Sequence, residues 1–476
     1  MLSDLHLLSL TEVASGIAAR KFSSLEVVSA CVAQIEKLDP LLNFFIWKEL
    51  DAALESARRA DEAVSAGAPL GRLHGVPLAN KDMFYAAGKL ATCGSTIRRD
   101  FRPGYTATTV QRLEDAGAIL LGGLAMVEFA MGPHGFNQHL AQCRNPWNPD
   151  HIPSGSSSGS GVSVASRAVF GSLGSDTGGS IRCPAAVSGV VGLLPTYGRV
   201  SRYGMMQMSF SLDSGGPLTR TVRDSARLLG VIAGADTRDA TSSHEPVADY
   251  EAGLDQGVRG VRVGVPTNYF YDGVVPEVRA ALHASLRVLE AQGADIVELT
   301  VPPAIYEAAE LHPLVMKAEG AANHANWMRE RSADYSDQVR NRLQAGSFIL
   351  ATDYIQALKA RSQLLEEFMR DVFGKVDALH TPILPMQVPT IAECMPTNGV
   401  AYLNMVTSLT RNTKVVNYLG LPAISVPCGF SGNGLPIAFQ LIGRPFAEAR
   451  LLSIARSYET ATTWHTMVPA IAQAQT

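Results

Sequence analysis

The chain has 476 residues, of which 46% are hydrophobic and 18% are charged, a balance typical of a globular protein with a large buried core. Its formal net charge of -4 provides no basic field for nucleic acid or an anionic membrane. We therefore expect a small-molecule substrate, with no nucleic-acid partner and no membrane partner.

The six cysteines form no C-x-x-C pair, which argues against a zinc site and a disulfide framework and favours reduced thiols. The N-terminal leucines are interrupted by Asp4 and His6, so this segment does not have the composition of a secretory signal. The longest apolar runs, at 116–127 and 183–198, are short or broken by Gly and Pro, which suits buried segments better than membrane spans. We predict a cytoplasmic protein.

In chain order, residues 1–66 have the pattern of helices, and a capping box at 23–26 opens one of them. From residue 73 onward, short β-rich runs alternate with helical segments at 108–116 and 278–291. The β-rich runs lie at 75–78, 118–121 and 261–265. This alternation predicts an α/β fold with a mixed sheet.

The stretch from about 300 to 375 is mostly helical and charged, and it is expected to form a peripheral layer. Neither a Pro-rich nor a Gly/Ser linker separates it from the rest. We therefore predict one domain over residues 1–476, with a core at 73–230 that contains the segments described next.

Residues 154–161 consist only of Gly and Ser, as a flexible linker would. A linker is disfavoured because an apolar helical stripe, which needs packing partners, follows directly. A second interpretation is the G-x-S-x-G nucleophile elbow with Ser157 as nucleophile. That motif needs a strand just before the turn, and Pro149 and Pro153 disfavour a central strand there.

Residues 174–182 form a glycine-rich turn that precedes a helical run. Consecutive glycines allow backbone amides to approach a ligand, and a helix N-terminus adds partial positive charge, as in an oxyanion hole. A phosphate-binding loop is the alternative, but the lysine that such a loop requires does not follow. A third candidate is Lys81, which ends an apolar run; a lone lysine there is more often a solvated surface residue.

Together these three elements resemble the amidase signature family of serine hydrolases, with the strongest match at about 153–229. The resemblance implies a large mixed β-sheet covered on both faces by α-helices, and no metal or organic cofactor. It also implies Ser180 as nucleophile, Ser156 after a cis peptide bond as proton shuttle, and Lys81 as base. Ser157, Asp176 and Arg182 would then have supporting roles, although Ser157 remains an alternative shuttle.

In this family's mechanism the amides of Thr177, Gly178, Gly179 and Ser180 hold the oxyanion while an acyl-enzyme forms. An exposed lysine has a pKa near 10.4 and is almost never neutral at pH 7. Burial can lower that pKa by several units, so the apolar run around Lys81 would be part of the mechanism. The expected activity is hydrolysis of a carbon-nitrogen bond in a linear amide.

Two departures from the family pattern stand out. Ser154 and Ser158 replace glycines in the serine-rich segment, which removes no reactive group. Residues 197–204 and 217–224 resemble catalytic subunits of tRNA-dependent amidotransferases, which release ammonia from glutamine for a partner enzyme. The acidic residue that holds the glutamine amino group in such subunits would fall near Thr410, which cannot supply that charge. Membership of an amidotransferase complex is therefore the alternative function.

The acyl pocket is expected to be apolar, since Met205, Met206, Met208 and Phe210 follow the signature. The candidate pocket residues are Met131, Met205, Met206 and Phe210. If they line the site, an aryl amide, anilide or carbamate would fit better than a short polar amide; the alternative is that they belong to the core. The helical N-terminus could serve a homodimer, and the sequence leaves the oligomeric state open.

Overall fold

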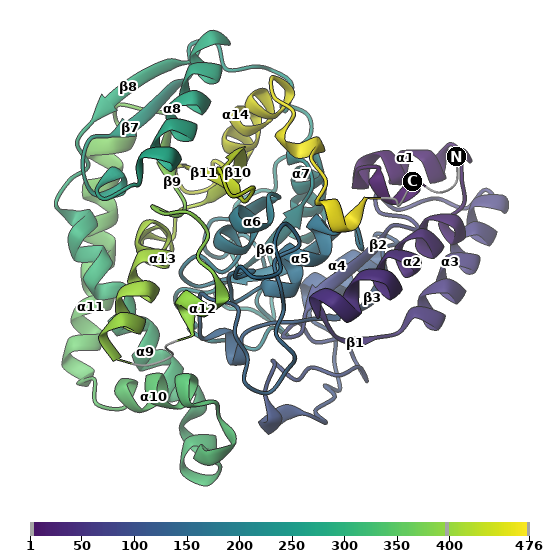
Figure 1. The fold of residues 1–476 in the computed structure, drawn as a ribbon, viewed down its shortest axis with the longest axis horizontal. Helices are drawn as coiled ribbons and strands as arrows, with labels where there is room; N and C mark the ends of the chain where they lie inside the picture. Colours follow the sequence, from purple (N-terminus) through teal and green to yellow (C-terminus); the bar gives the residue numbers. More distant parts are fainter. Residues whose placement is uncertain (1–3, 396–398, 474–476) are drawn as a thin grey trace.

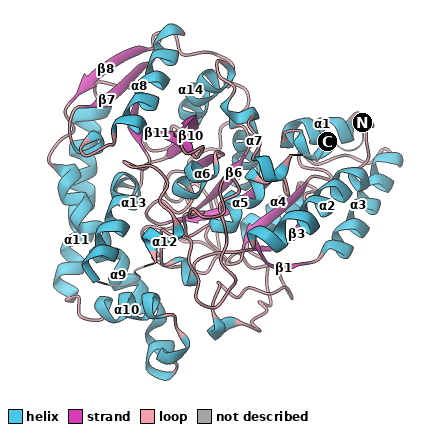
Figure 2. Cartoon of the chain, in the orientation of Figure 1, coloured by secondary structure: helices cyan, strands magenta, loops and turns pink. Residues whose placement is uncertain are grey.

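The computed structural model describes residues 4–395 and 399–473. Within them the strands join in one 11-stranded sheet with the order β1-β3-β2-β4-β6-β5-β10-β11-β9-β7-β8 (Figures 1 and 2). The strands are β1 (Phe45–Lys48), β2 (Pro77–Lys81), β3 (Ile119–Leu124), β4 (Gly171–Asp176), β5 (Val191–Leu194), β6 (Ser214–Thr219), β7 (Arg262–Pro266), β8 (Asp295–Leu299), β9 (Ala378–Pro382), β10 (Ala423–Phe430) and β11 (Pro436–Ile442).

Parallel and antiparallel pairs are combined in this sheet. Strand β2 runs parallel to β3 and β4, and β7 runs parallel to β8 and β9. The central strands from β4 through β6, β5, β10 and β11 to β9 pair antiparallel, as does the edge strand β1 with β3. The predicted α/β class with a mixed sheet is confirmed.

Helices surround the sheet. The α-helices are α1 (Leu10–Ala18), α2 (Ser24–Leu42), α3 (Leu50–Ser65), α4 (Thr108–Asp115), α5 (Ser158–Ala165), α6 (Arg182–Ser188), α7 (Val222–Ile232), α8 (Pro276–Ala291), α9 (Ala304–Glu330), α10 (Asp337–Gly346), α11 (Ala351–Phe368), α12 (Ile391–Cys394), α13 (Gly399–Leu419) and α14 (Glu448–Thr460). Helices α5 and α6 pack against each other and against the central strands. A second group of helices consists of α7, α14 and α8, in which α14 contacts both of the others. The stretch predicted as helical at 300–375 contains α9, α10 and α11, which stand beside α13 (Figure 1).

The first two α-helices begin at capping residues, and one of these caps was predicted from the sequence. The Ser23 hydroxyl accepts the Glu26 N–H at 3.1 Å, and the Glu26 carboxylate accepts the Ser23 N–H at 2.7 Å. Both contacts satisfy backbone N–H groups that have no partner inside the first turn of a helix. The predicted capping box at 23–26 is therefore confirmed, and a second one at Ser9 and Glu12 opens α1.

The strand order brings segments that are distant in the sequence together at the ends of two neighbouring strands. Because β2 and β4 are parallel neighbours, the end of β2 at Lys81 lies beside the end of β4 at Asp176. The serine-rich segment enters α5 from the loop at 149–153, where no regular strand is described and His151 makes one isolated bridge with Thr390. The strand required by the nucleophile elbow is thus missing before residue 155. No helix in the described ranges is long and apolar enough to span a membrane.

Candidate active site

Lys81 is fully buried at the end of β2, and its ammonium group contacts two serines. Its Nζ lies 2.7 Å from Ser156 Oγ and 2.8 Å from Ser175 Oγ. The Gly155–Ser156 peptide bond is cis, and Ser156 is also fully buried. The structure therefore brings together two of the three residues of the predicted relay, which lie 75 positions apart.

Burial lowers the pKa of Lys81 from 10.5 to about 7. The charges of Asp213 and Asp176 oppose this shift, since a nearby carboxylate favours the protonated amine. A pKa near 7 leaves a large fraction of the amine neutral at physiological pH, as a general base requires. The alternative in which Lys81 is a solvated surface residue is wrong, because the residue is wholly enclosed.

Ser157 occupies a different place from Ser156. Its hydroxyl donates to the Ser175 carbonyl at 3.2 Å and accepts the Ser175 N–H at 3.3 Å. It therefore ties the serine-rich segment to the end of β4, while the lysine contacts the preceding serine. This arrangement favours Ser156 over Ser157 as the shuttle.

Ser180 lies in the turn between β4 and α6 and is partly exposed. Among the described residues, no hydrogen bond joins its hydroxyl to Ser156. The Asp176 carboxylate shapes this turn by accepting the N–H groups of Gly179 at 2.6 Å and Ile181 at 3.1 Å. The Gly179 amide, one of four expected to hold an oxyanion, is thus engaged by a carboxylate, which leaves Thr177, Gly178 and Ser180 better placed for that role.

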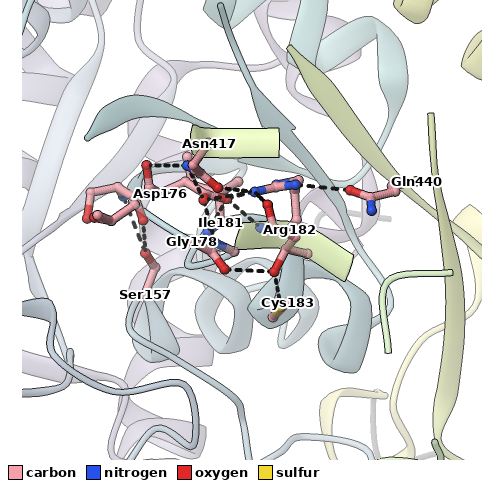
Figure 3. Close-up of polar contacts among 12 residues, drawn as sticks. Ser157, Asp176, Gly178, Ile181, Arg182, Cys183, Asn417 and Gln440 are labelled. Atoms are coloured by element: carbon pink, nitrogen blue, oxygen red, sulfur yellow. Dashed lines mark hydrogen bonds and ion pairs between the residues drawn. The ribbon is translucent and has the colours of Figure 1, made fainter. Parts of the chain in front are cut away.

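Arg182 and Asp176 form a fully buried ion pair beneath the turn, with Nε and Oδ2 3.1 Å apart. Figure 3 shows the guanidinium between the Asp176 carboxylate, Asn417 and Gln440. It donates to Asn417 Oδ1 at 2.5 Å and to Gln440 Oε1 at 3.0 Å. The pKa of Asp176 lies below its usual range because Arg182 and several hydrogen bonds outweigh the effect of burial. These contacts tie the turn to Asn417 on α13 and Gln440 on β11, and the supporting role of both residues in catalysis stays a prediction.

Residues from distant elements hold the outer side of the same turn. His312 Nε2 lies 2.8 Å from the Thr177 carbonyl, so this nitrogen carries the proton and donates. Thr413 Oγ1 donates to the Gly178 carbonyl at 2.7 Å, and Thr177 Oγ1 donates to Asp213 Oδ1 at 2.5 Å. Sequence reasoning missed these supports, because His312 and Thr413 lie 135 and 235 positions from their partners and carry no local motif.

A cavity of about 470 Å³ opens on Ser180 and on the preceding turn residues Thr177 and Gly178. Its apolar lining includes Met208 and Met316, and its charged lining comprises Glu310, Lys317, Arg342 and Lys414. Thr410 also lines it. The wall of the cavity is therefore mainly apolar, with four charged side chains among its lining residues.

None of the four predicted pocket residues lines this cavity, and their proposed place is corrected. Met205 is buried in the hydrophobic core, and Met206, whose sulfur accepts from Arg98 at 3.2 Å, packs against the same core. Phe210 is 42% exposed at another surface hollow. Met131 borders a small void that shares Met208 and Met316 with the lining of the cavity. The local run of methionines could not show which side of the turn each one faces. Among the described residues, no group of three or more His, Cys, Asp or Glu could hold a metal ion.

A mixed sheet surrounded by helices, with a buried lysine, a cis-bonded serine and a Gly-Gly-Ser turn at the ends of β2 and β4, is typical of a class of amide hydrolases. The Amidase family model matches residues 26–452, and this chain belongs to that family, whose enzymes hydrolyse carbon-nitrogen bonds. The family expectation from the signature segments is thus confirmed.

The chain is similar to several known proteins over nearly its whole length. It is 42% identical to a subunit of glutamyl-tRNA(Gln) amidotransferase from Myxococcus xanthus, over 95% of this chain and 96% of that one. The solved structure of the same subunit from Thermotoga maritima is 32% identical, with a TM-score of 0.81, and covers 98% of both chains. A bacterial aryl acylamidase of the amidase signature family is 27% identical, with a TM-score of 0.87 over 98% of this chain and 99% of that one.

These relatives bear on the expected partners. The two amidotransferase proteins are named for an enzyme that acts on a tRNA, so the expectation that this chain has no nucleic-acid partner gains no support from them. These two relatives likewise give no support to the expectation that the chain acts on a small molecule outside an amidotransferase complex.

Proposed function

We propose that the chain hydrolyses an amide with Ser180 as nucleophile, Ser156 as proton shuttle and Lys81 as base. The observation that carries this proposal is the 2.7 Å contact between Lys81 and Ser156, made by a fully buried amine whose pKa falls to about 7. The base and the shuttle are thus already paired. The Ser180 hydroxyl has to rotate toward Ser156 when substrate binds, as catalytic hydrogen bonds often tighten only in the complex.

In the proposed reaction, neutral Lys81 takes the proton of Ser156, which takes the proton of Ser180 as the Ser180 oxygen attacks the carbonyl carbon. The negative carbonyl oxygen is held by the N–H groups of the turn, chiefly those of Gly178 and Ser180. The carbon-nitrogen bond then breaks as Ser156 protonates the leaving nitrogen and recovers a proton from Lys81. Water attacks the resulting acyl-enzyme through the same relay and releases the carboxylic acid.

The comparisons favour glutamine as the amide and an amidotransferase as the setting. The identity of 42% extends over 95% of the chain to a protein that is named as part of such an enzyme. In this role the chain would release ammonia from glutamine, and its partners would be the other subunits and glutamyl-tRNA(Gln).

A second candidate is a free amidase that acts on a small molecule, including an aryl amide or a carbamate. The observation that favours it is Thr410, a neutral residue in the wall of the cavity where an amidotransferase would need a carboxylate for the glutamine amino group. Glu310, in the same wall, is the acidic group that could replace it if glutamine is the substrate.

The test measures hydrolysis of glutamine, an anilide and a carbamate by the wild type and by Ser180→Ala, Lys81→Met and Ser157→Ala variants. We expect Ser180→Ala and Lys81→Met to lose about 10³-fold or more in kcat, because residues that act as one relay fail together. Ser157→Ala should lose far less, since its hydroxyl binds the backbone of Ser175. Activity that survives Ser180→Ala but disappears with Ser157→Ala would show that the nucleophile assignment is wrong.

The two substrate candidates are separated by complementation. The chain is added to a Myxococcus xanthus amidotransferase preparation that lacks its own homologous subunit, together with glutamine and glutamyl-tRNA(Gln), and conversion of the tRNA is measured. Conversion that depends on Ser180 supports the amidotransferase role. Turnover of the anilide or carbamate without any conversion supports the free amidase.

A further inference from the structure

The hydroxyl of Ser175 lies between the lysine of the proposed relay and a methionine sulfur. Ser175 Oγ is 2.8 Å from Lys81 Nζ and 3.1 Å from Met83 Sδ. All three residues are buried, with at most 1% of each exposed. In the described part of the chain, the amine and the sulfur are the two groups that this hydroxyl contacts. A thioether carries no proton, so Ser175 donates to the sulfur and offers its lone pairs to Lys81.

The direction of this hydrogen bond matters because a neutral amine has a single lone pair. Lys81 Nζ contacts both Ser156 Oγ, at 2.7 Å, and Ser175 Oγ. The amine removes the proton of Ser156 only when its lone pair accepts from Ser156. If Ser175 donated to the same lone pair, Ser156 would have to accept from Lys81, and the relay would be blocked. The two serines therefore compete for one acceptor.

Met83 gives the Ser175 proton a different acceptor. Its backbone is fixed directly after the lysine, since the Met83 N–H donates to the Lys81 carbonyl at 2.6 Å and the Met83 carbonyl accepts the Met206 N–H at 2.9 Å. A thioether is a weak acceptor on an otherwise apolar side chain. The sulfur thus holds one hydroxyl proton, while the rest of the side chain helps to keep water from Lys81, whose pKa burial lowers to about 7.

The same arrangement suits the lysine after it has taken a proton. An ammonium group has no lone pair, so Ser175 can then only accept from it. The Ser175 proton still needs an acceptor, because an unpaired buried donor is costly. Among the described residues, the Met83 sulfur supplies that acceptor. Loss of the sulfur would therefore destabilise the protonated lysine, which is the form that the relay produces as Ser180 attacks.

A methionine that merely fills the core is the ordinary alternative. Met83 and Met205 both belong to the same hydrophobic core cluster, and both are buried. They differ in their polar contacts. The Met83 sulfur receives a hydroxyl that itself contacts Lys81, whereas no hydrogen-bond donor among the described residues reaches the Met205 sulfur. The two methionines therefore form a matched pair for a test.

We propose that Met83 is a positioning residue of the relay: its sulfur accepts the Ser175 proton, so that the lone pair of neutral Lys81 faces Ser156. This inference rests on the proposed function and deepens it, because it assigns the device that sets the direction of proton transfer from Ser156 to Lys81. Met83 does not line the cavity beside Ser180, and it acts through Ser175 rather than on the substrate.

The test measures the pH dependence of kcat for the wild type, Met83→Leu and the control Met205→Leu. The substrate is whichever of glutamine, the anilide and the carbamate the wild type hydrolyses fastest. Leucine has a volume close to that of methionine but no acceptor, so both variants should fold, which circular dichroism checks. The pKa of Lys81 is also measured without any substrate, by NMR of protein labelled with carbon-13 at the lysine ε-carbon. Comparison with Lys81→Met assigns the signal.

We expect Met83→Leu to lower the plateau of kcat by about fivefold or more. The midpoint of the pH profile and the pKa of Lys81 from NMR should both fall by about 0.5 pH unit or more, because the protonated lysine loses the support of one hydrogen bond. Met205→Leu should leave the plateau and the midpoint unchanged. In a Ser175→Ala background, Met83→Leu should cause no further fall in the pKa of Lys81, since the hydroxyl that the sulfur accepts is gone.

A plateau and a midpoint that Met83→Leu does not alter would overturn the inference, as would an equal change in Met205→Leu. If Met83→Leu does not fold, Ser175→Ala decides the matter. Its Lys81 should have a lower pKa, because a hydroxyl that accepts from the ammonium is lost. A raised pKa would show that Ser175 donates to the amine, against the proposal.

Failure of the proposed function looks different. The wild type would then hydrolyse none of the three substrates, or Ser180→Ala would hydrolyse them as well as the wild type does. The NMR measurement needs no turnover, so the pKa of Lys81 in Met83→Leu would still decide whether the sulfur sets the orientation of Ser175.

Discussion

Replacement of Asp176 by Asn tests whether the buried ion pair holds the reactive turn. Both Asp176 and Arg182 are fully buried, and the carboxylate also accepts N–H groups from Gly179, Ile181 and Asn417. Asparagine keeps the shape of the side chain but removes the charge and turns an acceptor into a donor. The guanidinium would then be left as a buried charge without its counterion, which costs about 3–5 kcal/mol. This is a large fraction of a typical total stability of about 5–15 kcal/mol.

The assay is equilibrium urea unfolding followed by circular dichroism for the wild type, Asp176→Asn, Arg182→Met and the double variant. We expect each single variant to lose about 3–5 kcal/mol. The double variant should lose less than the sum by about 2 kcal/mol or more, since it leaves no unpaired buried charge. Glu55→Gln is the control, because it breaks an exposed ion pair with Arg58 and should cost below about 1 kcal/mol.

A loss below about 1 kcal/mol in Asp176→Asn would refute this reasoning, as would strictly additive losses in the double variant. Either result would mean that the hydrogen bonds that the guanidinium donates to Asn417 and Gln440 hold it without help from the carboxylate. Amide hydrolysis measured on the same samples, under conditions where each variant remains folded, shows whether the turn keeps its geometry.

Three further predictions concern activity. Burial lowers the pKa of Lys81 to about 7, and the neutral amine is the active form. The value of kcat/KM should therefore rise about tenfold per pH unit below pH 7 and level off above pH 7. A flat profile from pH 5 to 8 would contradict this. Gly179→Ala should reduce kcat by about 100-fold or more, because Gly179 has a φ of +128° and an added Cβ would lie 2.4 Å from Thr413 Oγ1. Near-normal turnover by a folded variant would disprove this expectation. His312→Phe should lower kcat about tenfold through loss of its hydrogen bond to Thr177, and an unchanged kcat would argue against a positioning role.

The local patterns of the sequence were sufficient for several features. The capping box at 23–26, the alternation of β-rich and helical runs, and the glycine-rich turn at 174–182 each depend on residues only a few positions apart. Such signals act through backbone geometry and hydrophobic periodicity, which need no knowledge of distant contacts. The resemblance of three short segments to one family led to the same fold, and the family model confirmed it.

Tertiary structure alone decided the environment of those segments. The adjacency of β2 and β4 places Lys81 against Ser156 rather than Ser157, although the two serines are neighbours in the same polar run. The supports from His312 and Thr413, and the cations of the cavity, come from helices that approach the turn only after the chain has folded. The placement of Met205, Met206 and Phe210 in the pocket was wrong for the same reason, whereas Met208 from the same run does line the cavity. A run of apolar residues determines that side chains will be buried, whereas the order of strands and the packing of helices determine which of them face the substrate.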